Sequence, residues 1–286
     1  LAFRIPDSPP PIPGEQVART VQASPGHMVV TYSHAGFVVK EHILAPPDLP
    51  GILLLLELDA AVELEIHVEF QPVLQYAWPG GFGGQYLFWD EANRGFVLSE
   101  SLRERNAIIG SPWATEGSAH PAHRLAEAPS VMGIPVDRER AETELIPIAV
   151  VGGTGPREEI LATYREMLEQ AAAIPTEIAR TARERAGTTL QLSPQGWVGD
   201  RDQTAFGPIL EWAKVNLAEQ RVCNPDLGCG LVAGWGPSGT SLRPGFGWFF
   251  GGDAAINTLA MDATGQWEEV AEGLRFLARY QRDDGK

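Results

Sequence analysis

The sequence predicts an α+β protein in which an antiparallel β-sandwich precedes a series of helices. Two observations carry this prediction. Short runs rich in Val, Ile, Leu and aromatic residues follow one another up to about position 150, and helical spacing of apolar residues begins after Pro156. Because many strands without intervening helices favour a sandwich, we expect a β-sandwich domain over 1–155. A helical connector over 156–199 and a helical domain over 200–286 are expected to follow.

Seven runs are predicted to be strands of the sandwich, because Pro, Gly or Asp residues bound them. They are Met28–Tyr32, Gly36–Leu44, Ile52–Leu58, Val62–Phe70, Gln85–Trp89, Gly95–Glu100 and Leu145–Val151. In Val62–Phe70, charged residues and His67 alternate with apolar ones, which places the charges on the solvent face of a half-buried strand. The proline-rich opening, 6–13, is expected to be extended, at a sheet edge or in a linker.

The helical half is predicted from apolar spacing and from helix-starting residues. The predicted helices are Arg157–Ala173, Glu177–Ala186, Thr204–Glu219, Ala254–Thr264 and Trp267–Gln281, with Pro175 breaking the first from the second. Asp200 and Asp202 are expected to cap the third helix. Its predicted apolar face consists of Phe206, Ile209, Leu210, Ala213 and Leu217, and that of the last helix consists of Val270, Leu274, Leu277 and Ala278.

The charge and hydropathy of the chain limit its partners. A net charge of −15 argues against binding to nucleic acid and to anionic membrane surfaces, and it is compatible with a neutral substrate such as a glycan. No apolar run approaches the roughly 20 residues needed to span a bilayer. The oligomeric state is not indicated, and the cellular location is left open with a slight preference for the cytoplasm.

The cysteines, histidines and glycine loops predict neither a metal nor a cofactor. Cys223 and Cys229 lie six positions apart, and a local disulfide and two free thiols fit equally well. Only His120 and His123 are close in sequence, which is too few ligands for a zinc site. The glycine loop in Val150–Arg157 lacks both the Gly-Lys-Ser/Thr ending and the G-x-G-x-x-G spacing of phosphate-binding loops.

The segment Arg243–Asp253 is the most informative for chemistry, because an acid follows a run of glycines and aromatic residues. A carboxyl group beside aromatic side chains is partly desolvated, which suits it to the work of a general acid. The alternative is that Asp253 caps the helix that follows, and the two roles can coexist. Asp262, nine residues later, is expected to be a surface charge near the helix end.

Several motifs resemble those of glycogen-debranching-type (amylo-α-1,6-glucosidase-like) glycoside hydrolases. Pro244–Asp253 followed by Ala254–Leu259 resembles their Trp-Tyr/Phe-Gly-Arg-Asp signature. Phe206–Leu217, Asn224–Gly228, Gly230–Gly236 and Tyr280–Lys286 resemble other segments of the family, in the same order. The resemblance covers roughly residues 200–286. One departure is Gly252, where the family usually has an Arg whose fixed cation and donors would bear on sugar binding or on the orientation of the acid.

The resemblance implies an (α/α)6 barrel that hydrolyses α-glucosidic bonds of an oligo- or polysaccharide without a cofactor. It makes Asp253 the general acid, paired in an inverting mechanism with a second carboxylate about 6.5–9.5 Å away. It also makes Trp235, Trp248, Phe249, Phe250 and Arg243 candidates for substrate binding. Core packing is the alternative for the aromatic residues, and a structural ion pair is the alternative for Arg243.

The helices predicted after the connector are too few to complete such a barrel. The chain therefore resembles the front portion of the enzyme, with the general base expected beyond Lys286, and this fragment alone is expected to be inactive. Two other functions stay open. A non-catalytic carbohydrate-binding or structural module predicts glycan affinity without turnover. A barrel enzyme of other chemistry, such as a phosphorylase or lyase, predicts a phosphate-binding group or a Tyr/His pair in the pocket.

Overall fold

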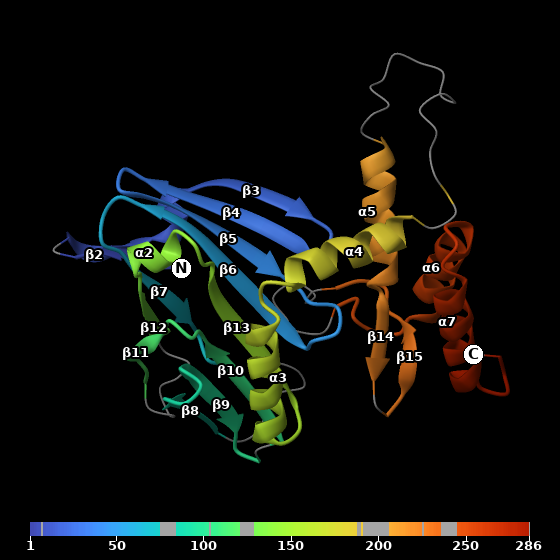
Figure 1. The fold of residues 1–286 in the computed structure, drawn as a ribbon. Coiled ribbons are helices and arrows are strands. Elements are labelled where there is room, and N and C mark those ends of the chain that lie inside the picture. The colour runs from blue at the N-terminus through green and yellow to red at the C-terminus, as the bar shows by residue number, and fades with distance from the viewer. Residues whose placement is uncertain are drawn as a thin grey trace. The chain divides into compact units, whose positions relative to one another are not determined.

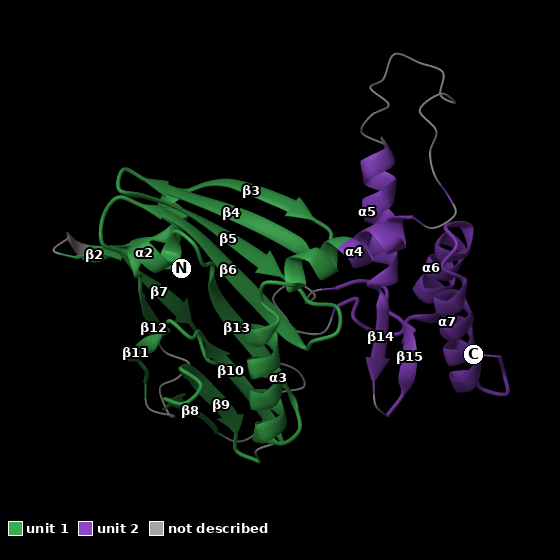
Figure 2. Cartoon of the chain, viewed as in Figure 1, with its two compact units in different colours: residues 1–76, 80–179 green, residues 77–79, 180–286 purple. Residues whose placement is uncertain are grey.

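The computed structural model describes residues 1–6, 8–74, 84–102, 104–120, 129–187, 190, 206–224, 226–235 and 245–285 (Figure 1). The chain forms two compact units, one of residues 1–76 and 80–179 and the other of residues 77–79 and 180–286 (Figure 2). We refer to them as unit 1 and unit 2.

Unit 1 is built on two antiparallel sheets. The larger has the strand order β3-β4-β5-β6-β13-β10-β9-β8, and the smaller has the order β11-β12-β7-β1-β2. The larger sheet consists of β3 (Ala18–Ser24), β4 (His27–His34), β5 (Phe37–Leu44), β6 (Gly51–Ala60), β8 (Gln85–Asp90), β9 (Gly95–Glu100), β10 (Arg105–Gly110) and β13 (Ile146–Thr154). The smaller consists of β1 (Ala2–Ile5), β2 (Ser8–Pro13), β7 (Glu65–Phe70), β11 (Thr115–Ser118) and β12 (Ser130–Pro135). The single-turn helices α1 (Gly14–Val17) and α2 (Arg138–Ala141) also belong to this unit.

The two sheets share one hydrophobic core, which confirms the predicted antiparallel β-sandwich. Fully buried side chains of the smaller sheet, such as Phe3 and Ile66, belong to the same cluster as Val39, Leu56 and Phe96 of the larger sheet. Burial of apolar area at about 25 cal/mol per Å² makes such an inter-sheet cluster the main source of stability in a sandwich.

The other face of the larger sheet is covered by helix α3 (Arg157–Glu169). Leu161, Tyr164 and Met167 of this helix lie in one buried cluster with Leu53 and Ile108 of the sheet. The Tyr164 hydroxyl donates to the Asn93 carbonyl oxygen at 3.0 Å. Burial, followed by the Asp90 charge, raises the pKa of Tyr164 well above its usual value, so this phenol stays a neutral donor. The larger sheet is therefore buried on both faces where α3 covers it.

Helix α4 (Ile174–Ala186) begins earlier than predicted. Pro175 lies in its first turn, where a missing N–H costs nothing, so this proline starts the helix and does not merely interrupt a longer one. Ile174 and Ile178 of α4 extend the cluster below α3. The boundary between the two units falls within this helix.

All seven predicted strands are confirmed, with ends that differ by up to three residues. In β7 and the residues before it, Leu64, Ile66 and Val68 are buried, which confirms the predicted alternation. The proline-rich opening forms β2, which pairs with β1 and is the edge strand of the smaller sheet, as expected for prolines that cannot donate.

Unit 2 contains a helix, a hairpin and two further helices. They are α5 (Phe206–Ala218), β14 (Arg221–Asn224), β15 (Gly228–Leu231), α6 (Gly251–Ala263) and α7 (Trp267–Tyr280). The three predicted helices are thus confirmed. Their shared core is small and consists of Leu231, Ala254 and Met261, with Leu217, Val270 and Leu277 packed against it.

The apolar face predicted for α5 is right only in part, because Leu217 packs on the core of unit 2 as predicted but two other members of the face do not. Ile209 and Ala213 are exposed, whereas Lys214, Val215 and Ala218 are buried. The reason is a polar anchor: the Lys214 ammonium donates to the Ala186 carbonyl at 2.9 Å and to the Leu190 carbonyl. A buried cation must be satisfied in this way, so the helix turns its lysine inward.

The face predicted for α7 is right in part. Val270 and Leu277 pack on the core as predicted, but Leu274 and Ala278 are exposed. Gly273 and Phe276 are the buried positions of this helix.

Among the described residues, no helix is long and apolar enough to cross a membrane. Within the same part of the chain, no group of three or more His, Cys, Asp or Glu side chains is placed to hold a metal ion.

Candidate functional site

Asp253 lies in the first turn of α6 with an exposed side chain. The helix begins at Gly251, and its N-cap is the extended residue Phe250, which makes no side-chain capping hydrogen bond. The alternative role of Asp253 as N-cap is therefore wrong, because the helix starts three residues earlier than the predicted start at Ala254. An acid in the first turn still favours the helix through its dipole.

Two loop segments are held side by side at this end of α6. The backbone N–H groups of Ala233 and Gly234 both donate to the Phe246 carbonyl, at 3.1 and 3.0 Å. The Asn257 side-chain amide of α6 donates to the Val232 carbonyl at 3.1 Å. These bonds bring the segment 231–235 and the segment 245–250 to the start of the helix that carries Asp253.

Three of the predicted sugar-binding aromatic residues are open to a ligand. The exposed fractions are 63% for Trp235, 46% for Trp248 and 43% for Phe250. The Trp235 indole N–H donates to the Glu219 carbonyl at 3.2 Å, which orients the ring. Aromatic faces of this kind suit stacking on the C–H faces of a sugar ring.

Phe249 differs from these three residues, because it packs inward. Its ring lies 4.5 Å from that of Phe276 of α7, centroid to centroid. Phe249 therefore packs against α7 and holds the segment 245–250 in place. This agrees with core packing, which is the alternative to sugar binding for this residue. Arg243 lies outside the described residues, as do Asp200 and Asp202.

Sequence reasoning missed Phe246 and Asn257 as parts of this site. Phe246 is exposed beside the other aromatic residues, and its carbonyl joins the two loop segments. Asn257 fastens the loop to α6. The only available signal was that Phe246 lies within the aromatic run, and a single asparagine inside a helix carries no signal.

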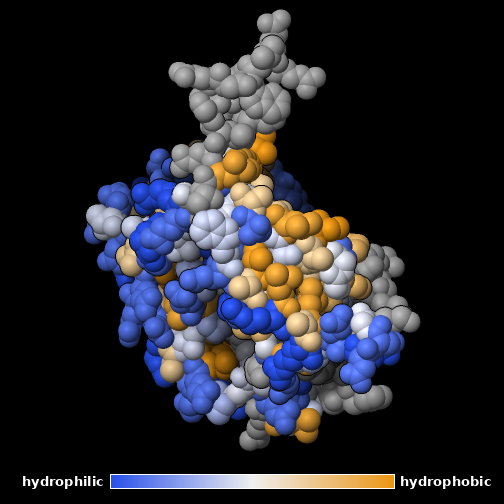
Figure 3. Space-filling model, turned by 90° about the vertical axis from the view of Figure 1, so that its right-hand side faces the viewer, coloured by the Kyte–Doolittle hydropathy of each residue, from blue (hydrophilic) through white to orange (hydrophobic). Residues whose placement is uncertain are grey.

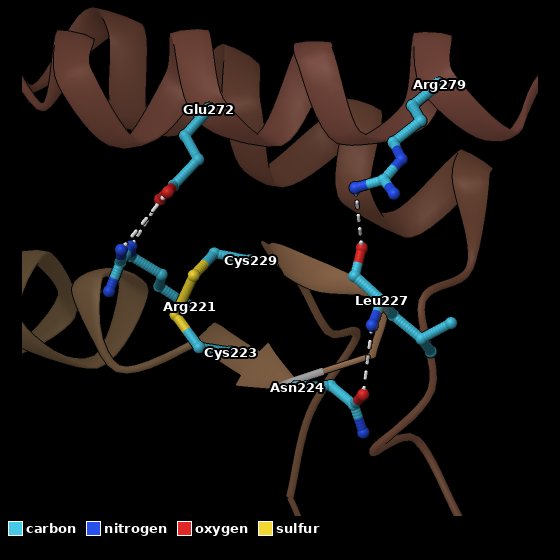
Figure 4. The surroundings of a disulfide bond; sticks show 7 residues. All are labelled: Arg221, Cys223, Asn224, Leu227, Cys229, Glu272 and Arg279. Carbon is cyan, nitrogen blue, oxygen red and sulfur yellow. Dashed lines mark hydrogen bonds and ion pairs between the residues drawn. A yellow bond between two sulfur atoms is a disulfide. The ribbon is translucent and has the colours of Figure 1, made fainter.

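The hairpin β14–β15 lies next to the site, with Gly230 against the rings of Phe249 and Phe276, and it is closed by a disulfide. Cys223 and Cys229 face each other in the pairing of the two strands and are bonded, which settles the alternative that the spacing left open (Figure 4). The Asn224 side-chain oxygen accepts from the Leu227 N–H at 3.1 Å, which tightens the turn.

Helix α7 holds the hairpin through polar contacts at both ends (Figure 4). Arg221 makes a two-bonded ion pair with Glu272, and this hydrogen bonding holds the pKa of Glu272 below its usual value. At the turn, the Tyr280 hydroxyl donates to the Leu227 carbonyl at 2.7 Å, and Arg279 approaches the same oxygen at 3.5 Å. The hairpin and the segment 245–250 are therefore both held against α7, the hairpin by these polar contacts and the segment by the packing of Phe249 on Phe276.

Replacement of Gly252 and of Gly230 by Ala is expected to change the free energy of unfolding in opposite directions. A Cβ at Gly252 meets nothing within 4 Å, whereas one at Gly230 lies 2.7 Å from the Phe276 ring and 3.0 Å from Phe249. Gly252→Ala should raise the free energy of unfolding by about 0.5–1 kcal/mol, because helical glycine has excess entropy when unfolded. Gly230→Ala should lower it by about 1–3 kcal/mol through overpacking.

Urea unfolding of both variants checks this prediction. Equal effects of the two substitutions would contradict it. Gly252 is the position where the resembling family usually has an Arg, and the Cβ of a side chain there would meet no described atom within 4 Å.

Comparison with known proteins shows a similarity of fold but no similarity of sequence. No protein-family model matches this sequence, and no curated protein sequence matches it. Among solved structures, a bacterial glucoamylase in complex with acarbose matches 99% of this chain with a TM-score of 0.61 at 12% identity. The fold of this chain is therefore similar to that of part of this glucoamylase. This chain spans only 44% of the length of that glucoamylase.

Two family GH92 enzymes are also similar at lower TM-scores. An inverting mannosidase from Bacteroides thetaiotaomicron matches with a TM-score of 0.41 at 9% identity, covering 72% of this chain and 28% of its own. A second GH92 glycosyl hydrolase matches with a TM-score of 0.42 at 11% identity, covering 77% and 32%. Because both TM-scores lie below 0.5, these two enzymes support no conclusion about this chain. The debranching-type specificity stays a prediction.

Proposed function

We propose that this chain is part of a glycoside hydrolase that cleaves α-glucosidic bonds of an oligo- or polysaccharide with inversion at the anomeric carbon. The observation that carries the proposal is the position of Asp253 in a glycosidase fold. Its exposed carboxyl group lies at the start of α6, beside two loop segments that present Trp235, Trp248 and Phe250.

In this proposal Asp253 is the general acid. Its carboxyl proton passes to the glycosidic oxygen as the bond from that oxygen to the anomeric carbon breaks, and a water activated by a second carboxylate attacks from the opposite face. Trp248, Phe250 and Trp235 hold the sugar rings by stacking, and Arg243 contributes a donor. We assign the second carboxylate to no described residue.

We further propose that the helical domain is an incomplete (α/α)6 barrel, because α6 is apolar on two opposite sides. Ala254, Thr258 and Met261 are buried within unit 2, whereas Ile256 and Leu259 on the other side are 68% and 73% exposed. A helix that is apolar on opposite sides is normally covered on both.

Other apolar side chains of unit 2 are exposed in the same way. They are Ile209 and Trp212 of α5 and Leu274 of α7. Figure 3 shows a patch of apolar side chains on the face turned to the viewer. Exposed patches of this kind mark surfaces that contact other protein. Further barrel helices would cover them and would also enclose Asp253, which is exposed here.

The test compares the 286-residue chain with a longer polypeptide that contains it and completes the helical domain. Maltotriose is the substrate, and NMR follows the anomeric configuration of the first glucose released. We expect no hydrolysis by this chain and hydrolysis with release of the β-anomer by the longer polypeptide.

A different experimental result would contradict each part of the proposal. Turnover by the 286-residue chain would contradict the incomplete barrel. Initial release of the α-anomer would contradict inversion. An inactive longer polypeptide that still binds maltotriose would favour the second candidate, a non-catalytic carbohydrate-binding module, for which Gly252 in place of the family's Arg is the supporting observation.

A further inference from the structure

Unit 2 has a pocket at the end of α6 opposite to Asp253. The pocket has a volume of about 350 Å³ and is lined by Glu184 and Arg185 of α4 and by 265–269, which form the α6–α7 turn and the start of α7. Asp253 lies in the first turn of α6, and the pocket follows its last residue, Ala263. At about 1.5 Å rise per residue, roughly 15 Å of helix separates the two.

Trp267 provides a fixed aromatic face in this pocket. Trp267 is the first residue of α7 and is 59% exposed, so most of this large apolar side chain is not packed against the protein. Its indole N–H donates to the Asp262 carbonyl at 3.2 Å. Because this bond uses the polar edge of the indole and fixes the ring, the face is preorganised for a ligand that stacks.

Gln266 is a buried polar residue that the fold leaves half satisfied. It lines the pocket, is only 5% exposed, and donates from its amide nitrogen to the Lys214 carbonyl at 3.1 Å. That bond fixes which atom of the amide is nitrogen. Its Oε1 has no hydrogen-bond partner among the described residues. A buried acceptor without a donor costs about 1–3 kcal/mol, so the feature calls for an explanation.

The charged side chains of the lining are mainly acceptors. Glu184, Glu268 and Glu269 contribute carboxylates, and Arg185 is the single cationic side chain of the lining, within 4.0 Å of Glu219. An exposed indole face surrounded by acceptors suits a ligand with apolar C–H faces and many hydroxyl donors. A cationic amine would instead be held best by a cage of several aromatic rings, and Trp267 is the one aromatic residue of the lining.

We propose that this pocket is a second saccharide-binding site, separate from the site of Asp253, that takes a neutral sugar. Its volume lies near the lower end of the range of about 300–1,000 Å³ for small-molecule pockets, so a mono- or disaccharide unit is the expected occupant. The sugar ring stacks on Trp267, and its hydroxyls donate to the glutamate carboxylates. Such a site holds a glucan chain on the enzyme without taking part in bond cleavage.

The test is a titration of the 286-residue chain with maltose, followed by NMR of the tryptophan indole N–H signals. Trp267→Ala assigns the Trp267 signal by its loss, and Trp248→Ala assigns the signal at the proposed catalytic site. We expect the Trp267 signal to shift with maltose. Calorimetry should then show that Trp267→Ala weakens maltose binding at this site about ten-fold, whereas Trp267→Phe, which keeps an aromatic face, weakens it less.

The control is Trp212→Ala, which removes an exposed tryptophan of α5 outside the pocket lining and should leave maltose binding unchanged. A Trp267 signal unmoved by maltose at tens of millimolar would overturn the proposal, as would a stronger response to tetramethylammonium than to maltose. A shift at Trp267 without one at Trp248 would support the second site by itself, whereas the site of Asp253 is tested by hydrolysis in the longer polypeptide, so the two proposals fail separately.

Discussion

Asp253→Asn is expected to slow hydrolysis of maltotriose about 10²–10⁴-fold in a polypeptide that completes the helical domain, since this is the usual contribution of a general acid. The amide has nearly the same shape as the carboxyl group but cannot give a proton to the glycosidic oxygen. Because Asp253 is exposed and is not the N-cap of α6, fold stability should fall only by the helix-dipole contribution, about 0.3–1 kcal/mol.

Asp262→Asn is the matched control for this prediction. Asp262 is an exposed acid on the same helix, in its last turn. Steady-state rates and thermal unfolding should be measured for both variants. Near-normal activity of Asp253→Asn, or equal losses in both variants, would reduce Asp253 to a structural helix residue.

Phe276→Ala is expected to cause the largest loss of stability in unit 2. The ring is buried and lies 4.5 Å from Phe249 and 4.9 Å from Tyr280, with Gly230 of the hairpin directly against it. Removal of a buried Phe side chain costs about 3–5 kcal/mol. Since the core of unit 2 is small, a loss of this size should unfold much of it at temperatures where unit 1 stays folded.

Circular dichroism and amide hydrogen exchange measure this effect. Exchange should rise in α6 and α7 and stay unchanged in the larger sheet. Tyr280→Phe is the control, because it removes only the exposed hydrogen bond to Leu227 and should cost about 0.5–1.5 kcal/mol. A change below about 1 kcal/mol for Phe276→Ala would show that the hairpin and the segment 245–250 do not depend on this ring.

The strands that could be predicted are those whose sequence shows an apolar run or an alternation. Among the strands that the sequence did not predict, β3 differs from β10 and β12 in the reason. β3 is a largely exposed strand with a polar sequence, so only its pairing with β4 makes it a strand. β10 and β12 begin or break their apolar runs with Arg, Asn or Gly, and each is stabilised by neighbours far away in sequence.

The sequence predicted those residues of the candidate site that lie within one short segment of the chain. Asp253, Trp248 and Phe250 are neighbours in sequence, and the structure places them together at the start of α6. The inward face of α5 could not be predicted, because it depends on carbonyls that Lys214 reaches from another part of the chain. Pairing of Cys223 with Cys229 required the register of the hairpin, which spacing alone does not give.

The pocket at Trp267 was also beyond sequence reasoning. Its lining joins α4 to the α6–α7 turn, about eighty positions later in the chain. The sequence showed an amphipathic helix starting at Trp267, and a tryptophan there is normally a core residue. Its binding role is indicated by the exposure of Trp267 and by the Gln266 side-chain oxygen, which has no hydrogen-bond partner in the described part of the chain.

The role of Asp253 is tested most directly by the leaving-group dependence of the Asp253→Asn rate. A general acid matters for a sugar leaving group, which must be protonated, and matters little for α-glucosyl fluoride, whose leaving group departs as an anion. We predict that the variant loses about 10²–10⁴-fold on maltotriose but stays within about ten-fold of the unaltered enzyme on α-glucosyl fluoride. Equal losses on both substrates would contradict the assignment of Asp253 as the proton donor.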